Sequence, residues 1–600
     1  MTNNITKRVE ALRDYLRRNG LWAFIIPSTD PHQGEYVPAH WQTRQWISGF
    51  DGSAGTAVVT LTDAALWTDS RYFIAAARQI EGTPFHLMKD GLPETPGITE
   101  WLIGEMKNEK LRIKNDSGEA TVNDQRSMVN DKVVGVDGSV YTSADLEELS
   151  RELGKAGIRL RTDLDPAEEL WTDRPPIPKN KVEIQPLEFA GETAESKIER
   201  VRQALRKQND ESILISQLDD IAWLLNLRGS DVHCNPVFVS YVLLTLRDVT
   251  LFIDSEKLDE TVRNYLKSIK VKVKPYSLFR QEFSPFTGEL EGVWSLVSSL
   301  KSIKNPAEIE GYRRAMVRDG VAMVKFLRWL KPAVEAGEAT ELSIDKKLTA
   351  LRAEQPLYRG LSFDTIAAYG PHGAIVHYEA TPESDIPLEP KGLLLLDSGA
   401  QYQDGTTDIT RTIALGPLTD EERFDYTLVL KGHIRLAQTR FPDGISGTRI
   451  DALARYDMWQ HGINYGHGTG HGVGSYLCVH EGPHQIRHTW KPAPLHAGMT
   501  VTDEPGIYRE GKHGVRIENT MLIVDDGETE FGRFLRLEPL TLCPIDLTPV
   551  IWDMLTQEET DYINNYHRKV YEELSPYLTE EEKKTLSNSP LKGEDTNKNI

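Results

Sequence analysis

Apolar and polar residues near the start of the chain follow spacings typical of alternating helices and strands. Residues 1–20 carry apolar side chains three and four positions apart, which predicts a helix whose buried face holds Val9, Leu12 and Leu16. The apolar run WAFIIP at 22–27 predicts a strand. A helix followed at once by an apolar strand is the beginning of an α/β arrangement.

Residues 44–73 continue this arrangement with apolar strands, Gly or Asp turns and then a helix. The polar stretch 105–132 interrupts the pattern, and we interpret it as a surface excursion. Order returns with a predicted strand at 133–138 and a predicted helix from 146 to 153. Together these elements predict a first α/β domain over residues 1–165.

The segment 164–196 is typical of an extended linker because it contains three prolines within four positions, at 175, 176 and 178. The pattern then begins again, with a charged helix at 197–207 and strands at 213–215 and 249–254. This repetition predicts a second α/β domain that, with the linker, spans residues 166–301.

A short motif supports the repeat. The residues Trp46, Gly52 and Ser53 lie 177 positions before Trp223, Gly229 and Ser230. A match of three residues can also arise by chance, so the repeated order of predicted elements remains the stronger observation.

A third unit is expected from Ser302 to Pro544. It begins with KNPAEIEGYRRAM, where Asn and Pro precede a helical pattern, and a second helix is predicted at 339–353. Beyond it, residues 545–600 predict helices packed on this unit, with helically spaced apolar positions: Trp552, Leu555, Tyr562, Tyr566 and Val570. The last dozen residues are polar and predict a disordered tail.

Composition narrows the possible classes. Six hundred residues are too many for one core and predict three or four domains. A net charge of -21 argues against nucleic acid or an anionic membrane as the main partner and favours a cationic ligand such as a peptide amine. Three scattered cysteines provide neither a disulfide framework nor a thiolate metal site. We therefore expect a reducing, cytoplasmic compartment, and no apolar run is long enough to span a membrane.

The strongest chemical signal lies in LLLLDSGAQYQDGTTDITRT, residues 393–412. Four consecutive leucines lead into Asp397, and Asp408 follows eleven positions later. A carboxylate at the end of so apolar a strand must be protonated, paired or bound to a metal, because an uncompensated buried charge is costly.

Three later stretches add further polar groups. GHGTGHG at 466–472 places His471 among glycines, which disfavour a helix and let the backbone pass close to a ligand. In TDEPG, Glu504 precedes a proline and is biased to an extended conformation. In GVRIENT, Val515 and Ile517 alternate with Arg516 and Glu518, so Arg516 can pair with Glu518 or with the site around it.

Each of these residues alone has an ordinary structural role, such as a turn residue or a core histidine. Four carboxylates and one imidazole together suit two divalent cations, and oxygen-rich ligands favour manganese-like ions over thiophilic ones. The predicted metal ligands are Asp397, Asp408, His471, Glu504 and Glu518.

This ordered set resembles the dinuclear site of the pita-bread metallopeptidases. The runs GPHGAIVHY, YGHGTGHGVGSYLCVHEGP and DEPGIY are similar to the three-domain Xaa-Pro aminopeptidase branch of that family. The resemblance covers most of the chain and is most specific between 360 and 540. It implies a mixed α/β and α+β fold with two creatinase-like N-terminal α/β domains, a pita-bread catalytic domain and a short C-terminal helical extension.

The resemblance also implies a function. The expected enzyme removes a single N-terminal residue that precedes proline, using a hydroxide held between two divalent ions, with manganese the expected metal. Glu504 is expected to act as general base, His377 and His480 to position the substrate and stabilise the transition state, and His467 to line the pocket for the residue after the cut. Arg516 is expected to orient the metal-binding carboxylates. A homodimer is also implied.

Other functions remain open at this point. A prolidase would use the same metals on X-Pro dipeptides, although the tandem N-terminal domains and GHGTGHGVG favour the aminopeptidase. A non-catalytic binding module of this fold would have lost metal ligands, and a creatinase-like hydrolase needs none. The remaining histidines of this region are expected to be structural or on the surface, with His513 left unassigned: His372, His461, His484 and His488.

Overall fold

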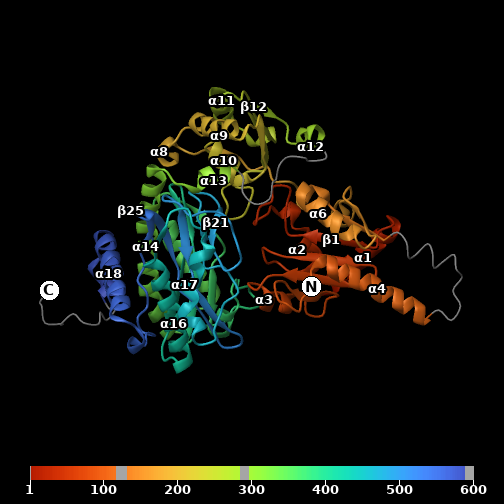
Figure 1. The fold of residues 1–600 in the computed structure, drawn as a ribbon. Coiled ribbons are helices and arrows are strands. Elements are labelled where there is room, and N and C mark those ends of the chain that lie inside the picture. The colour runs from red at the N-terminus through yellow and green to blue at the C-terminus, as the bar shows by residue number, and fades with distance from the viewer. Residues whose placement is uncertain (1, 117–131, 284–295, 588–600) are drawn as a thin grey trace, which may run out of the picture.

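The computed structural model describes residues 2–116, 132–283 and 296–587. The chain forms three modules that follow one another in sequence, and the first and second modules both lie against the third (Figure 1). The predicted tail and most of the polar stretch at 105–132 lie outside the described residues. The described part of that stretch corrects the prediction, because residues 105–116 continue a helix, α4 (Ile98–Asp116).

The first module runs from α1 (Thr2–Arg18) to β6 (Arg159–Arg161) and is built on a six-stranded sheet in the order β4-β3-β2-β1-β5-β6. The predicted N-terminal helix is confirmed, since Val9, Leu12 and Leu16 are fully buried against the sheet. The remaining strands are β1 (Ala23–Pro27), β2 (Thr56–Thr60), β3 (Ala64–Thr68), β4 (His86–Lys89) and β5 (Val133–Val136). The other helices include α2 (Thr43–Ser48), α3 (Phe73–Gln79) and α6 (Ser143–Gly154).

The second module runs from α9 (Ala194–Gln208) to β12 (Val271–Lys274) and contains a four-stranded sheet in the order β12-β11-β10-β8. Its other strands are β8 (Ser212–Ile215), β10 (Ser240–Thr245) and β11 (Val249–Ile253). Two further helices, α10 (Leu218–Leu224) and α11 (Glu260–Ser268), flank it. The preceding linker is extended but carries short elements, among them α7 (Pro166–Leu170), β7 (Glu183–Ile184) and α8 (Leu187–Ala190).

Strand pairing confirms the predicted repeat. In the first module β1 pairs antiparallel with β2, β2 antiparallel with β3, and β3 parallel with β4. In the second, β8, β10, β11 and β12 pair in the same sequence of directions. Trp46 on α2 and Trp223 on α10 occupy the helix between the first two strands of each repeat, and both are buried. The three-residue motif therefore reflects a repeated topology.

The third module begins with α14 (Pro306–Glu335), preceded by α13 (Leu296–Ser302). Asn305 caps α14, Pro306 is its first residue and Glu308 completes a capping box, which confirms the predicted Asn-Pro start. The second predicted helix is α15 (Glu341–Ala353).

Two helix pairs of the third module pack against two antiparallel sheets. The buried side chains of α14 and α15 form one core with β14 (Ile366–Tyr369), β15 (Leu393–Ser398) and β18 (Ile409–Ala414). Those of α16 (Asp420–Ala437) and α17 (Thr448–Trp459) form another with a sheet of four strands. These four strands are β19 (Arg440–Pro442), β22 (Thr500–Asp503), β25 (Asn519–Thr529) and β26 (Gly532–Pro539). The third module also contains short strands outside these two sheets: β13 (Tyr358–Leu361), β16 (Ala400–Tyr402), β17 (Gly405–Thr406), β20 (Gly470–Gly472), β21 (Glu481–Ile486), β23 (Gly506–Arg509) and β24 (His513–Arg516).

The C-terminal helices α18 (Gln557–Leu574) and α19 (Glu580–Ser587) pack on the third module, beside α14 (Figure 1). Tyr566 and Val570 are buried in its core and Tyr562 packs against it, as the helical spacing predicts. Trp552 differs from the prediction, because it lies in a short 3-10 turn before α18. Within the described segments, no helix is both long and apolar enough to cross a bilayer.

Candidate metal centre

Two adjacent strands position the first two carboxylates. Asp397 lies near the end of β15, whose leucines are buried on both faces, and it is opposite Ile366 on β14 and Thr410 on β18. Asp408 immediately precedes β18. Both side chains are buried, so two carboxyl groups lie in the protein interior.

The other three groups arrive from separate strands. His471 is the middle residue of β20, which confirms that the glycine-rich run is not a helix. Glu504 follows β22, and its backbone N–H donates to Thr469 O at 2.8 Å. Glu518 links β24 to β25, and its N–H donates to Thr410 O at 3.1 Å. Backbone hydrogen bonds thus hold segments distant in sequence around the end of β15.

The structure brings all five predicted groups to one cavity. His471 Nε2 lies 3.4 Å from Asp408 Oδ2 and 3.4 Å from Glu504 Oε1. One ligand atom each from Asp408, His471 and Glu518 lie within 4.8 Å of one another. These three residues, with Asp397 and Glu504, line a cavity of about 690 Å³.

The crowding of these carboxyls is electrostatically unfavourable in the absence of cations. Burial raises the pKa of Asp408 well above its usual value, and Asp397 and Glu504 raise it further. Burial, Asp408 and Asp397 do the same to the pKa of Glu518. Burial, opposed by Arg516 and assisted by Asp397, raises the pKa of Glu504 to about 7. Such mutual repulsion is relieved when cations bind.

The atoms of the site fit a pair of divalent ions. Asp397 Oδ1 is buried and makes no hydrogen bond to any described residue. Four carboxylates would balance two divalent cations, and carboxylate oxygens with one imidazole suit manganese-like ions. The donor set and the unsatisfied oxygen therefore fit the predicted dinuclear centre.

The protonation state of His471 is also suitable. Burial and the neighbouring His480 lower its pKa to about 3, so the ring is neutral at physiological pH. His471 Nδ1 lies 2.9 Å from Gly472 O, and because a carbonyl only accepts, Nδ1 carries the proton. The lone pair of Nε2 is then directed toward Asp408 and Glu504, as metal coordination requires.

Arg516 lies directly behind the carboxylates. It is almost fully buried and pairs with Asp397 Oδ2 at 2.8 Å, rather than with Glu518. It also donates to Tyr508 Oη at 2.7 Å and to Thr410 Oγ1 at 3.2 Å. Val515 and Ile517 point into the core on the opposite face, as predicted from the alternation. The guanidinium therefore fixes the orientation of Asp397.

Two of the three predicted catalytic histidines line the same cavity. These are His377 and His480, and the His480 ring centre lies 4.4 Å from that of His471. His467 is not among the residues that line the cavity. Its Nε2 lies 2.7 Å from Tyr508 Oη, which also accepts a hydrogen bond from Arg516. His467 is therefore linked to Arg516 through Tyr508. The structure thus separates His467 from the other two.

Residues of the first module that sequence reasoning missed complete the site. Glu35 Oε2 lies 2.9 Å from His480 Nδ1, and Tyr72 Oη lies 2.8 Å from His377 Nδ1. Ser53 Oγ joins these contacts, at 3.0 Å from Glu35 Oε1 and 2.8 Å from Tyr72 Oη. No local motif around these residues indicates a site. Only the docking of the first module on the third brings them to the histidines.

The first module also sets different charges on the two histidines. Burial alone would lower the pKa of His480, but the Glu35 carboxylate raises it above its usual value. Burial lowers the pKa of His377 well below its usual value, and Arg71 lowers it further. The Glu35 carboxylate therefore favours the protonated form of His480, while burial favours the neutral form of His377, which allows the two rings to take different roles.

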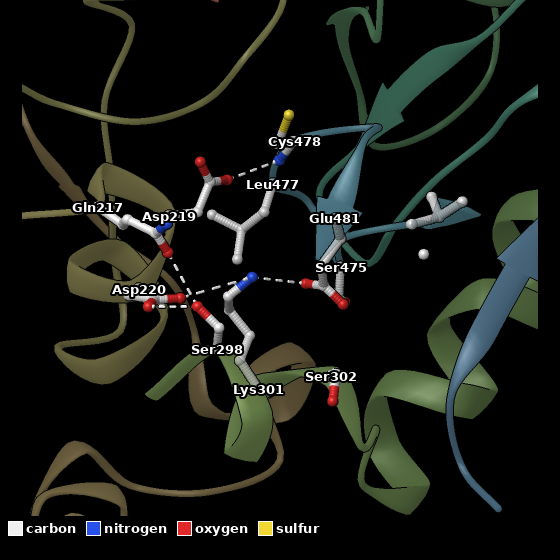
Figure 2. A network of polar contacts seen from close by, with 12 residues as sticks. Gln217, Asp219, Asp220, Ser298, Lys301, Ser302, Ser475, Leu477, Cys478 and Glu481 are labelled. Atoms are coloured by element: carbon white, nitrogen blue, oxygen red, sulfur yellow. Dashed lines mark hydrogen bonds and ion pairs between the residues drawn. The ribbon is translucent and has the colours of Figure 1, made fainter. Parts of the chain in front are cut away.

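A buried polar network between the second and third modules holds the loop that carries His480 (Figure 2). Lys301 Nζ lies 2.9 Å from Glu481 Oε2, and Lys304 pairs with the other oxygen of Glu481. Asp219 Oδ1 accepts from the backbone N–H of Cys478 at 2.8 Å. Glu481 and Cys478, which flank His480 in the sequence, are therefore held in place by residues that lie outside the cavity.

The histidines left outside the predicted site have structural surroundings. His372 Nδ1 pairs with Glu341 at 2.9 Å, and the buried His484 contacts Thr500 O at 2.7 Å. His513, which was unassigned, pairs with Asp425 at 2.9 Å. His461 packs edge-on against a phenylalanine, and His488 lies near a buried arginine.

Comparison with known protein families divides the chain into four matched regions. Residues 8–166 and 173–298 match creatinase/prolidase N-terminal domains. Residues 310–525 match metallopeptidase family M24, and residues 533–588 match the C-terminal region of that family.

Full-length relatives carry consistent names. A probable Xaa-Pro aminopeptidase P of Laccaria bicolor is 38% identical, with 96% of this chain and 91% of that protein covered. Aminopeptidase P1 of Arabidopsis thaliana is 36% identical, with coverage of 94% and 95%. The crystal structure of X-prolyl aminopeptidase from Caenorhabditis elegans, described as a cytosolic enzyme with a di-nuclear active site, matches with a TM-score of 0.90. It is 34% identical and covers 98% of this chain and 99% of its own.

Proposed function

The chain belongs to metallopeptidase family M24, and from this membership we propose that it is an Xaa-Pro aminopeptidase that hydrolyses the bond between an N-terminal residue and a following proline. Its fold joins two creatinase-like N-terminal domains to a pita-bread domain and a C-terminal extension. The observation that carries the proposal is the convergence of four carboxylates and one neutral imidazole on a single cavity.

We propose that Asp397, Asp408, His471, Glu504 and Glu518 hold two divalent ions, manganese being the preferred metal. Support comes from the unsatisfied Asp397 oxygen and from the oxygen-rich donor set. When bound, two such ions supply a water that is nucleophilic near neutral pH and polarise the carbonyl that it attacks.

The side chains around the ions supply the remaining steps. Glu504, which the family resemblance assigns as general base, accepts the proton of the attacking water and passes it to the departing amine. His480, whose protonated form is favoured by Glu35, donates to the oxygen that gains charge in the transition state. His377, oriented by Tyr72, positions the substrate. We retain the prediction that His467 contributes to the pocket for the residue after the cut, acting through Tyr508.

The proposed preference for proline rests on the names of the full-length relatives and agrees with the chemistry of the bond. A bond before proline is a tertiary amide, so its nitrogen carries no hydrogen for an extended-substrate protease to bind. An enclosed cavity that receives the free amine among acidic groups requires no such hydrogen bond. The walls come from all three modules, including Tyr72 of the first and Cys234 of the second.

We further propose the domain boundaries 1–165, 166–301, 302–544 and 545–600, supported by a separate sheet in each of the first two segments. A cytoplasmic location is proposed because the Caenorhabditis elegans protein is described as cytosolic. We also propose a homodimer. Tyr456 and Trp459 lie exposed three residues apart on α17 and offer an apolar face for a second copy.

One experiment tests the function. Purified protein is stripped with a chelator, reloaded with Mn, Co or Zn and assayed on an X-Pro dipeptide, an X-Pro-Pro tripeptide and a longer X-Pro peptide, while bound metal is counted. With Mn, we expect two ions per chain and release of one residue from the longer peptides. Cleavage of the dipeptide alone would indicate a prolidase, and no cleavage with two ions bound would overturn the proposal.

A further inference from the structure

A second group of metal-binding side chain types lies at the rim of the same cavity, where the second module meets the third. His233 and Cys234 occupy a turn between β9 (Leu227–Arg228) and β10, and Asp364 precedes β14. His233 Nε2 lies 2.8 Å from Asp364 Oδ1, and one ligand atom from each of the three residues lies within 4.8 Å of the others. All three residues line the cavity.

The turn that carries His233 and Cys234 is fixed to the third module. Val232 and Asn235 pair across it, and the carbonyl of Cys234 accepts from Gln401 Nε2 at 3.1 Å. The same Gln401 nitrogen also donates to Leu477 O at 2.8 Å, on the loop that leads to His480. The backbone of the turn that carries the imidazole and the thiol is therefore held by contacts outside the group itself.

The position of Asp364 in the fold is set by the strand that follows it. It lies two residues before Ile366, whose strand partner is Asp397 of the candidate metal centre. Its carboxylate is half exposed and the His233 ring is largely exposed, with 48% and 76% of the side chains accessible to solvent. A cation from solution can thus reach the group without any movement of the backbone.

We propose that His233, Cys234 and Asp364 form a third metal site, selective for a thiophilic divalent cation such as Zn²⁺, which joins the second module to the third at the cavity rim. One sulfur, one nitrogen and one oxygen donor are typical of zinc with a water as fourth ligand. Tetrahedral bonds of about 2.0–2.3 Å place neighbouring ligand atoms roughly 3.3–3.8 Å apart, which these side chains reach by small rotations.

Binding is an acid–base exchange in which no electrons are transferred. The Cys234 thiol and the His233 imidazolium each lose one proton to solvent. The thiolate forms the metal–sulfur bond, and the freed nitrogen lone pair of His233 and an oxygen of Asp364 complete the protein ligands. The competing explanation is that His233 and Asp364 form only an ion pair between modules. Hydrogen bonds that the His233 ring donates to Asp364 and Cys234 raise its pKa to about 10, which favours that pair in the metal-free protein.

Cadmium provides a direct test, because its bond to thiolate gives an ultraviolet charge-transfer band that carboxylates and imidazoles do not. Protein saturated with Mn²⁺ is titrated with Cd²⁺, followed by competition with Zn²⁺. We expect one equivalent of Cd²⁺ to produce the band and Zn²⁺ to remove it. Absence of the band in the wild-type protein would overturn the proposal. The signal comes from the Cys234 sulfur, so it does not depend on the proposed peptidase activity.

Matched variants identify the ligands. Cys234→Ser should abolish the band, and Asp364→Asn should weaken Cd²⁺ binding at least about tenfold. His496→Asn is the control, because His496 forms an equally close pair with Asp443, at 2.9 Å, with no cysteine assigned to it. It should bind Cd²⁺ as the wild type does. A band that survives in Cys234→Ser, or unchanged binding by Asp364→Asn, would overturn the proposal. Melting of each metal-free variant shows that it is folded.

Discussion

Replacing Glu481 by Gln should destabilise the joint between the second and third modules. Glu481 is fully buried and its two oxygens each meet an ammonium group, that of Lys301 at 2.9 Å and that of Lys304. Gln keeps the shape but removes the negative charge, so both ammonium groups lose their main partner. Lys301 retains Asp220 at 3.7 Å, which moderates the loss.

The expected cost can be worked out from these contacts. Breaking a buried ion pair by removing one partner costs about 3–5 kcal/mol. Because Asp220 remains and the Gln oxygen still accepts one hydrogen bond, we expect the lower value, about 3 kcal/mol. For a unit of roughly 200 residues, this lowers Tm by about 6–12 °C. Differential scanning calorimetry would measure the shift in the transition of the third module.

Two further variants separate charge from shape. Glu559→Gln removes the partner of a single ammonium, that of Lys431 at 2.8 Å, and should lower Tm by less. In the triple variant Lys301→Met, Lys304→Met, Glu481→Leu, the carboxylate and both ammonium groups are removed together, so much of the stability should return. If Glu481→Gln melts within 2 °C of the wild type, or the triple variant melts no higher than Glu481→Gln, the electrostatic reasoning is refuted.

The sign of the pH dependence follows from the same pair. Burial alone would raise the pKa of Glu481, but Lys301 and Lys304 hold it below its usual value. The folded state therefore favours the ionised carboxylate. This contribution to stability is complete above the unfolded pKa of about 4.3 and is lost as the pH falls through the lower folded value. The Tm difference between wild type and Glu481→Gln should narrow only in that acidic range.

Three other outcomes are expected. Tyr72→Phe removes the hydrogen bond to His377 and should lower kcat about threefold to tenfold in steady-state assays; an unchanged kcat would show that the first module does not orient this ring. Asp408→Asn should weaken metal binding at least about tenfold, measured by metal analysis after dialysis, and a protein that keeps two ions would contradict the assigned ligand set. Without metal, the raised pKa of Glu504, about 7, means that its stabilising contribution is present below about pH 4.3 and is lost as the pH rises toward 7. Stripped protein should therefore melt at a lower temperature at pH 8 than at pH 5, while metal-loaded protein should not, and a Tm of the stripped form that did not fall would argue against cation-dependent relief of these carboxyls.

The sequence was sufficient to predict the elements with strong periodicity. The buried face of α1, the capped start of α14 and the strand that delivers Asp397 all depend on local patterns, and the structure has each of them. The repeat of Trp46 at Trp223 was correctly linked to a repeated topology. Helix α4 was missed because its outer turns are polar, so its apolar spacing is weak there.

The site was predicted less completely than the fold. Its five proposed metal-binding groups follow buried strands or glycine-rich turns, which can be recognised in sequence. Glu35 and Tyr72 could not be found this way, because their partners are 445 and 305 residues away and belong to another module. The position of His467 behind Arg516 also depends on the packing of β23 and β24, which local spacing does not specify.

The walls of the cavity have a consequence for which chains the enzyme can process. Parts of three modules line a cavity of about 690 Å³, a volume comparable to that of sites for small ligands and much smaller than a folded protein. We expect that an N-terminus held in a helix or a sheet cannot enter this cavity, whereas an unfolded N-terminus can. The architecture therefore acts as a sieve that spares structured proteins and admits short or unfolded peptides, whatever residues they carry further along.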